Sequence, residues 1–109
     1  MAFRALMVRN MRTADADQVA AAFAEHDRSG FPERLGLRAR TLFHYHGLYA
    51  HLLEADSDIL PAVHGLREDP AFTEVDRRVA EYLTPYDPER PSMLEARAEP
   101  FYVWEPGLR

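Results

Sequence analysis

Residues 38–55, RARTLFHYHGLYAHLLEA, contain two runs rich in β-forming residues with two residues between them. The runs extend over residues 36–45 and 48–55, and His46-Gly47 has the length and the glycine of a two-residue hairpin turn. This turn places Tyr45 opposite Leu48 and thereby fixes the antiparallel register of the whole hairpin. The hairpin is the element from which the rest of the fold is predicted.

The register assigns side chains to the two faces of the hairpin. It pairs Leu42 with His51, Arg40 with Leu53 and His44 with Tyr49, and paired side chains lie on the same face. Arg40 and His51 then become diagonal neighbours, with Cβ atoms roughly 7 to 8 Å apart, which leaves room for a substrate oxygen between them. The opposite face is apolar, with Phe43, Ala50 and Leu52 among its members. So much apolar surface predicts a homodimer packed through its sheets.

The remaining chain predicts an α+β fold. Alternation predicts a strand over residues 2–11, and Asp15 with Gln18 predicts a helix N-terminus near Asp15. That helix is expected to end at Gly30 and Pro32, with residues 28–36 as a loop. Beyond the hairpin we expect a short helix capped at Asp56 or Ser57, a helix from Ala71 with the stripe Phe72, Val75, Val79, Tyr82 and Leu83, an extended loop over residues 84–92, and a strand over residues 94–104.

This order of elements predicts a ferredoxin-like βαββαβ sandwich. It has an antiparallel four-stranded sheet with helices on one face, and the apolar second face makes it the dimeric α+β barrel type. With 109 residues, the chain fits a single domain over residues 1–109.

Composition excludes several kinds of chemistry. The chain has no cysteine, and all thirteen of its basic residues are arginines, so thiolate nucleophiles, cysteine metal sites and lysine Schiff bases are excluded. A net charge of -5 without a basic cluster argues against nucleic acid as partner. No apolar run is long enough to cross a membrane, and the N-terminal residues do not resemble a signal peptide, so we expect a cytoplasmic protein.

Four polar residues are the candidates for catalysis. His26 lies on the core-facing stripe of the first helix with Val19, Ala22 and Phe23, and Asp27 follows it. Arg40 is costly to bury without an anion or acceptor. We expect His26, Asp27, Arg40 and His51 to converge on a cavity whose sheet wall includes Leu42, Tyr49 and Leu53.

Each candidate also has a purely structural interpretation. His26 could be a hydrogen-bonded core histidine, and Asp27 could be solvent-exposed at the helix end. The cluster of His44, His46 and His51 lacks the spacing of a metal site, so we expect no metal. Four aromatic residues could pack in the core or line a pocket for a flat ligand: Tyr82, Tyr86, Tyr102 and Trp104.

Four short segments, AFAEHD, LYAHLLEAD, VAEYLTPY and FYVW, carry a resemblance to a known family. In their order and spacing the chain resembles the tetracenomycin-type aromatic polyketide cyclases of bacterial type II pathways. The resemblance implies a dimeric ferredoxin-like protein that needs no cofactor. It implies that a late ring of a poly-β-keto intermediate is closed by intramolecular aldol condensation with dehydration. His26, Asp27, Arg40 and His51 match the corresponding family residues.

In this interpretation His51 and His26 exchange protons with the substrate, Asp27 tunes an imidazole or anchors a hydroxyl, and Arg40 holds the oxyanion. Two other functions fit the same architecture. One is a cofactor-free monooxygenase acting on an aromatic polyketide, which Asn10 and Trp104 could support. The other is a non-catalytic dimeric module that binds a ligand.

Overall fold

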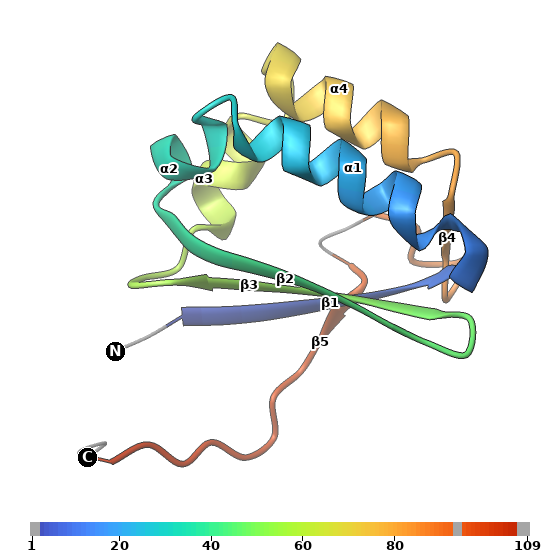
Figure 1. Ribbon diagram of the computed structural model, residues 1–109. Coiled ribbons are helices and arrows are strands. Elements are labelled where there is room, and N and C mark those ends of the chain that lie inside the picture. The colour runs from blue at the N-terminus through green and yellow to red at the C-terminus, as the bar shows by residue number, and fades with distance from the viewer. Residues whose placement is uncertain (1–2, 93–94, 107–109) are drawn as a thin grey trace.

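The computed structural model describes residues 3–92 and 95–106 of the chain. Its helices lie together on one face of an antiparallel sheet, and no helix of the described residues covers the opposite face (Figure 1). The elements, in chain order, are β1 (Phe3–Met11), the 3-10 turn η1 (Thr13–Asp15), α1 (Ala16–Asp27), α2 (Phe31–Leu35), β2 (Leu37–Tyr45), β3 (Leu48–Ala55), α3 (Leu60–Gly65), α4 (Pro70–Val79), β4 (Leu83–Pro85) and β5 (Arg97–Ala98). The strands are ordered β2-β3-β1-β4, and β5 also pairs with β1. This is the predicted ferredoxin-like arrangement.

The β2–β3 hairpin has the predicted register. Leu42 pairs with His51 and Arg40 with Leu53, on either side of a turn in which His46 has a φ of 45° and Gly47 a φ of 86°. Two successive positive φ values are the signature of a type I′ turn, whose twist matches that of the strands. Next to Leu37 the register shifts at a bulge, which returns the side chain of Leu37 to the helix-covered face.

The first helix begins where predicted but is not capped as predicted. Asp15 precedes α1, yet its side chain makes no capping hydrogen bond. Its carboxylate instead accepts two hydrogen bonds from the guanidinium of Arg12, each 3.1 Å long. The helix ends before Gly30, which has a φ of 81°, but Pro32 does not stop helix formation. Proline fits the first turn of a helix, and so Phe31–Leu35 forms α2 where a loop was expected.

The chain after β3 departs further from expectation. The third helix begins at Leu60, after the predicted caps Asp56 and Ser57. Ile59 occupies its N-cap position, and Pro61 lies in its first turn. The fourth helix starts at Pro70, where the carboxylate of Asp69 accepts a hydrogen bond from the backbone N–H of Ala71. The predicted helical stripe ran on to Tyr82 and Leu83, but α4 ends at Val79. Leu83–Pro85 forms a short strand, β4, whose last two residues were expected to begin a loop.

The last strand is much shorter than predicted. Leu94 lies outside the described residues. Among the described residues of the predicted strand, only Arg97–Ala98 pairs with β1, and the chain beyond Ala98 leaves the sheet on the side away from the helices (Figure 1). Pro100 has no N–H to give to a ladder, which explains the early end of the strand. The aromatic side chains that follow are largely exposed, Trp104 to 71%. The fourth strand position is therefore shared by β4 and β5.

Two buried clusters join the helices to the sheet. The first lies under α1 and α4 and consists of Met11, Val19, Ala22, Phe23, Tyr49, Val75, Val79 and Leu83. The second lies under α3 and consists of Ala5, Met7, Leu53, Ala55, Ile59 and Val63. Both clusters include residues of β1 and β3 that face the helices. Polar side chains on the same face of these strands are therefore surrounded by packed apolar residues. Within the described residues, no helix is both long and apolar enough to span a membrane.

Candidate active site

A continuous set of hydrogen bonds connects the C-terminal end of α1 to the centre of the sheet. The Nε of Arg40 donates to both carboxylate oxygens of Asp27, at 3.1 and 3.2 Å, and the Nη2 of Arg40 lies 3.0 Å from Oδ1. The Nη1 of Arg40 lies 2.8 Å from Nε2 of His51, whose Nδ1 lies 3.2 Å from the hydroxyl of Tyr49. The order is Asp27, Arg40, His51, Tyr49, which we call the polar chain.

The polar chain determines where the proton of His51 lies. A guanidinium can only donate, so Nε2 of His51 accepts from Arg40 and carries no hydrogen. The proton of the neutral ring is then on Nδ1, which donates to the Tyr49 oxygen. The charge of Asp27 acts to raise the pKa of His26. The carboxylate of Asp27 binds Arg40 and holds the guanidinium against the ring of His51.

Burial and charge keep His51 neutral. His51 is 2% exposed, and its ring forms a T-shaped pair with the ring of Phe23, with 5.0 Å between centroids. Burial, followed by the positive charge of Arg40, lowers the pKa of His51 from 6.5 to about 3. Burial and the same charge also lower the pKa of His26, while Asp27 opposes the shift. Burial raises the pKa of Tyr49 against the charges of Arg40 and Arg9, so its hydroxyl keeps its proton.

Three of the four candidate residues line one small cavity. His26 from α1, Arg40 from β2 and His51 from β3 share a space of about 50 Å³ whose other walls are mostly apolar. The fourth, Asp27, reaches this group through Arg40. The direct hydrogen bond between Arg40 and His51 occupies the place where a substrate oxygen was expected to fit.

The predicted substrate-binding residues divide into two groups. Leu53 lines the cavity beside His51, while Leu42 and Tyr82 pack against the core cluster that contains Tyr49. The other three lie away from this cavity in the structure and are exposed: Tyr86 (64%), Tyr102 (77%) and Trp104 (71%). Tyr102 and Trp104 are displaced because the final strand ends before them.

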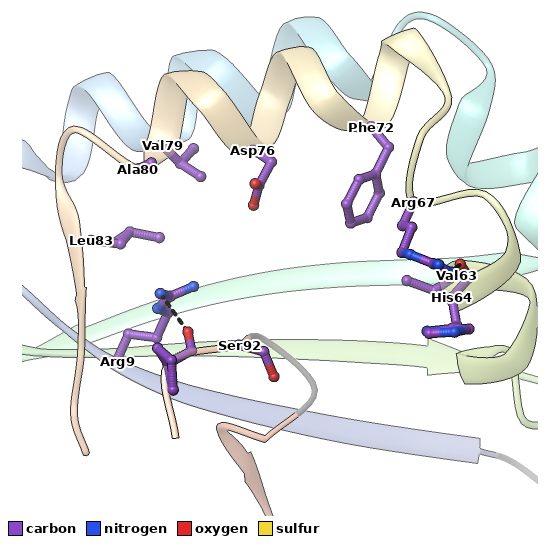
Figure 2. A pocket seen from close by; sticks show the side chains of 11 residues that line it. Arg9, Val63, His64, Arg67, Phe72, Asp76, Val79, Ala80, Leu83 and Ser92 are labelled. Carbon is purple, nitrogen blue, oxygen red and sulfur yellow. Dashed lines mark hydrogen bonds between the residues drawn. The ribbon is translucent and has the colours of Figure 1, made fainter. Parts of the chain in front are cut away.

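A larger cavity, which the sequence interpretation missed, adjoins the first. It measures about 490 Å³ and lies between α4, α3 and residues 91–92, with Arg9 on its sheet side (Figure 2). The two cavities share Val63, Phe72, Asp76 and Val79 as lining residues. The alternation of β1 contained the signal, because it puts Arg9 on the same face as the buried Met7 and Met11.

The described residues contain no group of three histidine, aspartate or glutamate side chains placed to hold a metal ion. The acid–base groups of the site are imidazoles, and its fixed positive charge is a guanidinium. An arginine held by one carboxylate beside a neutral imidazole can stabilise a developing oxyanion next to a proton acceptor.

The fold and the buried polar chain define a ferredoxin-like α+β protein with a candidate active site between sheet and helices. The chain belongs to the polyketide synthesis cyclase family, whose model it matches over residues 3–105. It is 51% identical to tetracenomycin F2 cyclase of Streptomyces glaucescens over 104 residues, 95% of each chain. It is 30% identical to polyketide synthase CurG of Streptomyces cyaneus, over 93% of this chain and 95% of that one.

Solved structures give the same result for the fold. A structure of tetracenomycin F2 cyclase superimposes with a TM-score of 0.90 at 50% identity, covering 94% of this chain and 97% of that one. A protein of Caulobacter crescentus, related by its description to antibiotic biosynthesis monooxygenases, superimposes with a TM-score of 0.56 at 13% identity over 75% of this chain and 78% of that one. The second similarity concerns the fold alone.

Proposed function

We propose that this polyketide cyclase closes a late ring of an aromatic type II poly-β-keto intermediate by intramolecular aldol condensation with loss of water. The observation that carries the proposal is the buried polar chain, in which Arg40 and a neutral His51 lie side by side at a cavity. The relationship to tetracenomycin F2 cyclase supports a polyketide substrate. The proposal needs no cofactor.

The proton transfers can be assigned to the two histidines. A neutral imidazole removes a proton from a carbon between two carbonyls, and the resulting enolate carbon attacks a ketone to form the carbon–carbon bond. The imidazolium protonates the new alkoxide. The neutral imidazole then removes a second proton from that carbon, and the resulting imidazolium protonates the hydroxyl group as it leaves, so one water is released and the neutral imidazole is restored. His51 is the main acid–base group and His26 its partner across the cavity.

Arg40 binds the oxyanion in this mechanism. An enolate oxygen that attracts the guanidinium draws Nη1 away from His51 and frees the lone pair on Nε2. The same negative charge favours the imidazolium, so it raises the pKa of His51 during the reaction. Asp27 keeps Arg40 in place through its hydrogen bonds to Nε.

We also propose that the active protein is a homodimer. The helix-free face of the sheet carries Phe43, 50% exposed, and Tyr45, 70% exposed. Leu6 and Val8 of β1 lie on the same face by the register of the sheet. A second copy of the chain packed against this face removes the apolar side chains from water.

The test of the proposed function is incubation with an early-cyclised polyketide intermediate, followed by mass analysis and oxygen uptake. A product lighter by one water, formed without oxygen consumption, is expected. Oxygen uptake with quinone formation would instead identify a monooxygenase, and binding without turnover would identify a ligand-binding module. Two residues suggested for oxygen chemistry lie away from the catalytic cavity: Asn10 donates to the carbonyl of Pro85 at 3.2 Å, and Trp104 is exposed.

A further inference from the structure

Arg9 is the charged member of an apolar row on β1. Ala5, Met7 and Met11, at alternating positions of the strand, are all buried against the helices. Arg9 lies opposite Tyr49 on β3, while Met7 lies opposite His51. Arg9 and His51 are therefore diagonal neighbours, with Cβ atoms roughly 7 to 8 Å apart.

His51 consequently has an arginine on each side. Arg40 is its diagonal neighbour on β2, as Arg9 is on β1, because β3 lies between these strands. Arg40 has a carboxylate partner in Asp27. The carboxylate of Asp27 thus balances the charge of Arg40 within the polar chain, of which Arg9 is not a member.

The guanidinium of Arg9 is incompletely hydrogen-bonded. Its Nη2 donates to the carbonyl oxygen of Pro91 at 3.2 Å. Its Nε is buried and has no hydrogen-bond partner among residues 3–92 and 95–106. A buried N–H of a charged group without an acceptor is costly, so the site favours a ligand that supplies one.

The larger cavity lies directly above this guanidinium. Arg67 and His64 lie at its α3 end, and Asp76 points into it from α4 (Figure 2). Among the charged side chains that line it, two are arginines and one is an aspartate. The cavity therefore favours a negatively charged ligand group, and the guanidinium of Arg9 lines its sheet side.

The space at His51 is too small for a polycyclic substrate, so such a substrate must extend into the larger cavity. The space at His51 measures about 50 Å³, which is enough for a few water molecules only. The adjoining 490 Å³ falls within the range of about 300 to 1,000 Å³ that is usual for ligand pockets. A substrate that reacts at His51 must therefore place most of its ring system beside Arg9.

We propose that Arg9 binds a carboxylate on the aromatic substrate and so determines which end of the substrate reaches His51. The proposal rests on the proposed cyclase function. The planar guanidinium of an arginine can donate to both oxygens of a carboxylate, a pairing that lysine or a neutral donor reproduces poorly. Arg9 is then a specificity residue, separate from the acid–base groups.

The test compares two probes that differ in one charge: rhein, a dihydroxyanthraquinone carboxylate, and its methyl ester. Calorimetry at neutral pH is expected to show roughly 10-fold to 100-fold tighter binding of the acid, the range for a hydrogen-bonded charge. Arg9→Gln is expected to abolish this preference while leaving ester affinity nearly unchanged. The matched control is Arg4→Gln, which removes an exposed arginine from the opposite face of the same strand and is expected to keep the preference.

The proposal would be overturned by equal binding of acid and ester to the wild-type protein, by no binding of either, or by an Arg9→Gln variant that keeps the preference. If Arg9 only anchors the Pro91 segment, Arg9→Gln weakens both probes alike, which also contradicts it. Should Arg9→Gln fail to fold, Arg9→Lys keeps the charge and is expected to retain part of the preference. His51→Ala is expected to keep all of it, so failure of the cyclase function is distinguishable.

Discussion

His51 contacts groups that fix both its charge and its tautomer. Arg40 donates to Nε2, the hydroxyl oxygen of Tyr49 accepts a hydrogen bond from the N–H at Nδ1, and Phe23 packs against the ring in a T-shaped arrangement. A histidine with a pKa of about 3 is a weak base in the resting protein. Its basicity must therefore rise when a substrate oxyanion engages Arg40, which couples proton transfer to correct substrate placement.

The tautomer of His51 gives a direct prediction for nuclear magnetic resonance. In the ligand-free protein, the ¹⁵N shifts of His51 are expected to show a hydrogen on Nδ1 and no titration between about pH 5 and pH 8, since its pKa is far below that range. Arg40→Gln is expected to raise the pKa by removing a positive charge. Titration of His51 near its ordinary pKa in the wild-type protein contradicts this account.

The lowered pKa of His51 also predicts how stability depends on pH. Protonation favours the unfolded chain, where the pKa is ordinary. The contribution of His51 is therefore complete above about pH 6.5 and is lost as pH falls toward about 3, by roughly 1.4 kcal/mol per pH unit. Urea denaturation is expected to show a shallower pH dependence for His51→Gln over this range. His44→Gln, at an exposed position on β2, is the control that keeps the wild-type slope.

The sequence predicted those parts of the site that lie on the hairpin. The turn fixes the register, and the register brings Arg40 to His51. The contact between Asp27 and Arg40 could not be predicted, because residue spacing does not say how α1 crosses the sheet. The position of Arg9 on the helix-covered face was predictable from the alternation of β1. Its proposed role could not be predicted, because it depends on a cavity formed by α3, α4 and residues 91–92.

At the scale of elements, the sequence patterns predicted correctly those elements that a single turn or helical stripe determines. They failed for strands whose length depends on pairing with a neighbouring strand. The predicted strand over residues 94–104 has suitable residues, yet among its described residues only Arg97–Ala98 pairs with β1, because Pro100 has no N–H to give to the ladder. Short helices such as α2 are likewise stabilised by packing, here of the buried Phe31, more than by their own sequence.

The turn supports a prediction about the hairpin. Gly47→Ala is expected to destabilise the fold by about 1 to 2 kcal/mol, because a φ of 86° is strained for a residue with a Cβ. An added Cβ meets nothing within 4 Å at this position, so the cost comes from the backbone alone. Gly65→Ala, in α3 and equally open, is the control and is expected to be neutral or stabilising. Equal urea midpoints for the two variants would show that the turn does not constrain the hairpin.

The whole molecule has one face covered by helices and one that is not. If a second copy covers the open face, sedimentation at micromolar concentration is expected to show a dimer. Phe43→Arg is expected to yield a monomer, because it places a charge in the centre of the apolar surface. Thr73→Arg, exposed on α4, is the matched control that stays dimeric. A monomeric wild-type protein contradicts the dimer.

The central claim is that His51 carries the acid–base chemistry of a cyclisation. The most direct test is the rate at which His51→Ala converts an early-cyclised polyketide to the dehydrated product, measured on protein shown to be folded by circular dichroism. The account predicts that the rate falls by roughly 10²-fold or more, the usual effect of removing a positioned acid–base group. A folded His51→Ala variant with the wild-type rate and product pattern would contradict it.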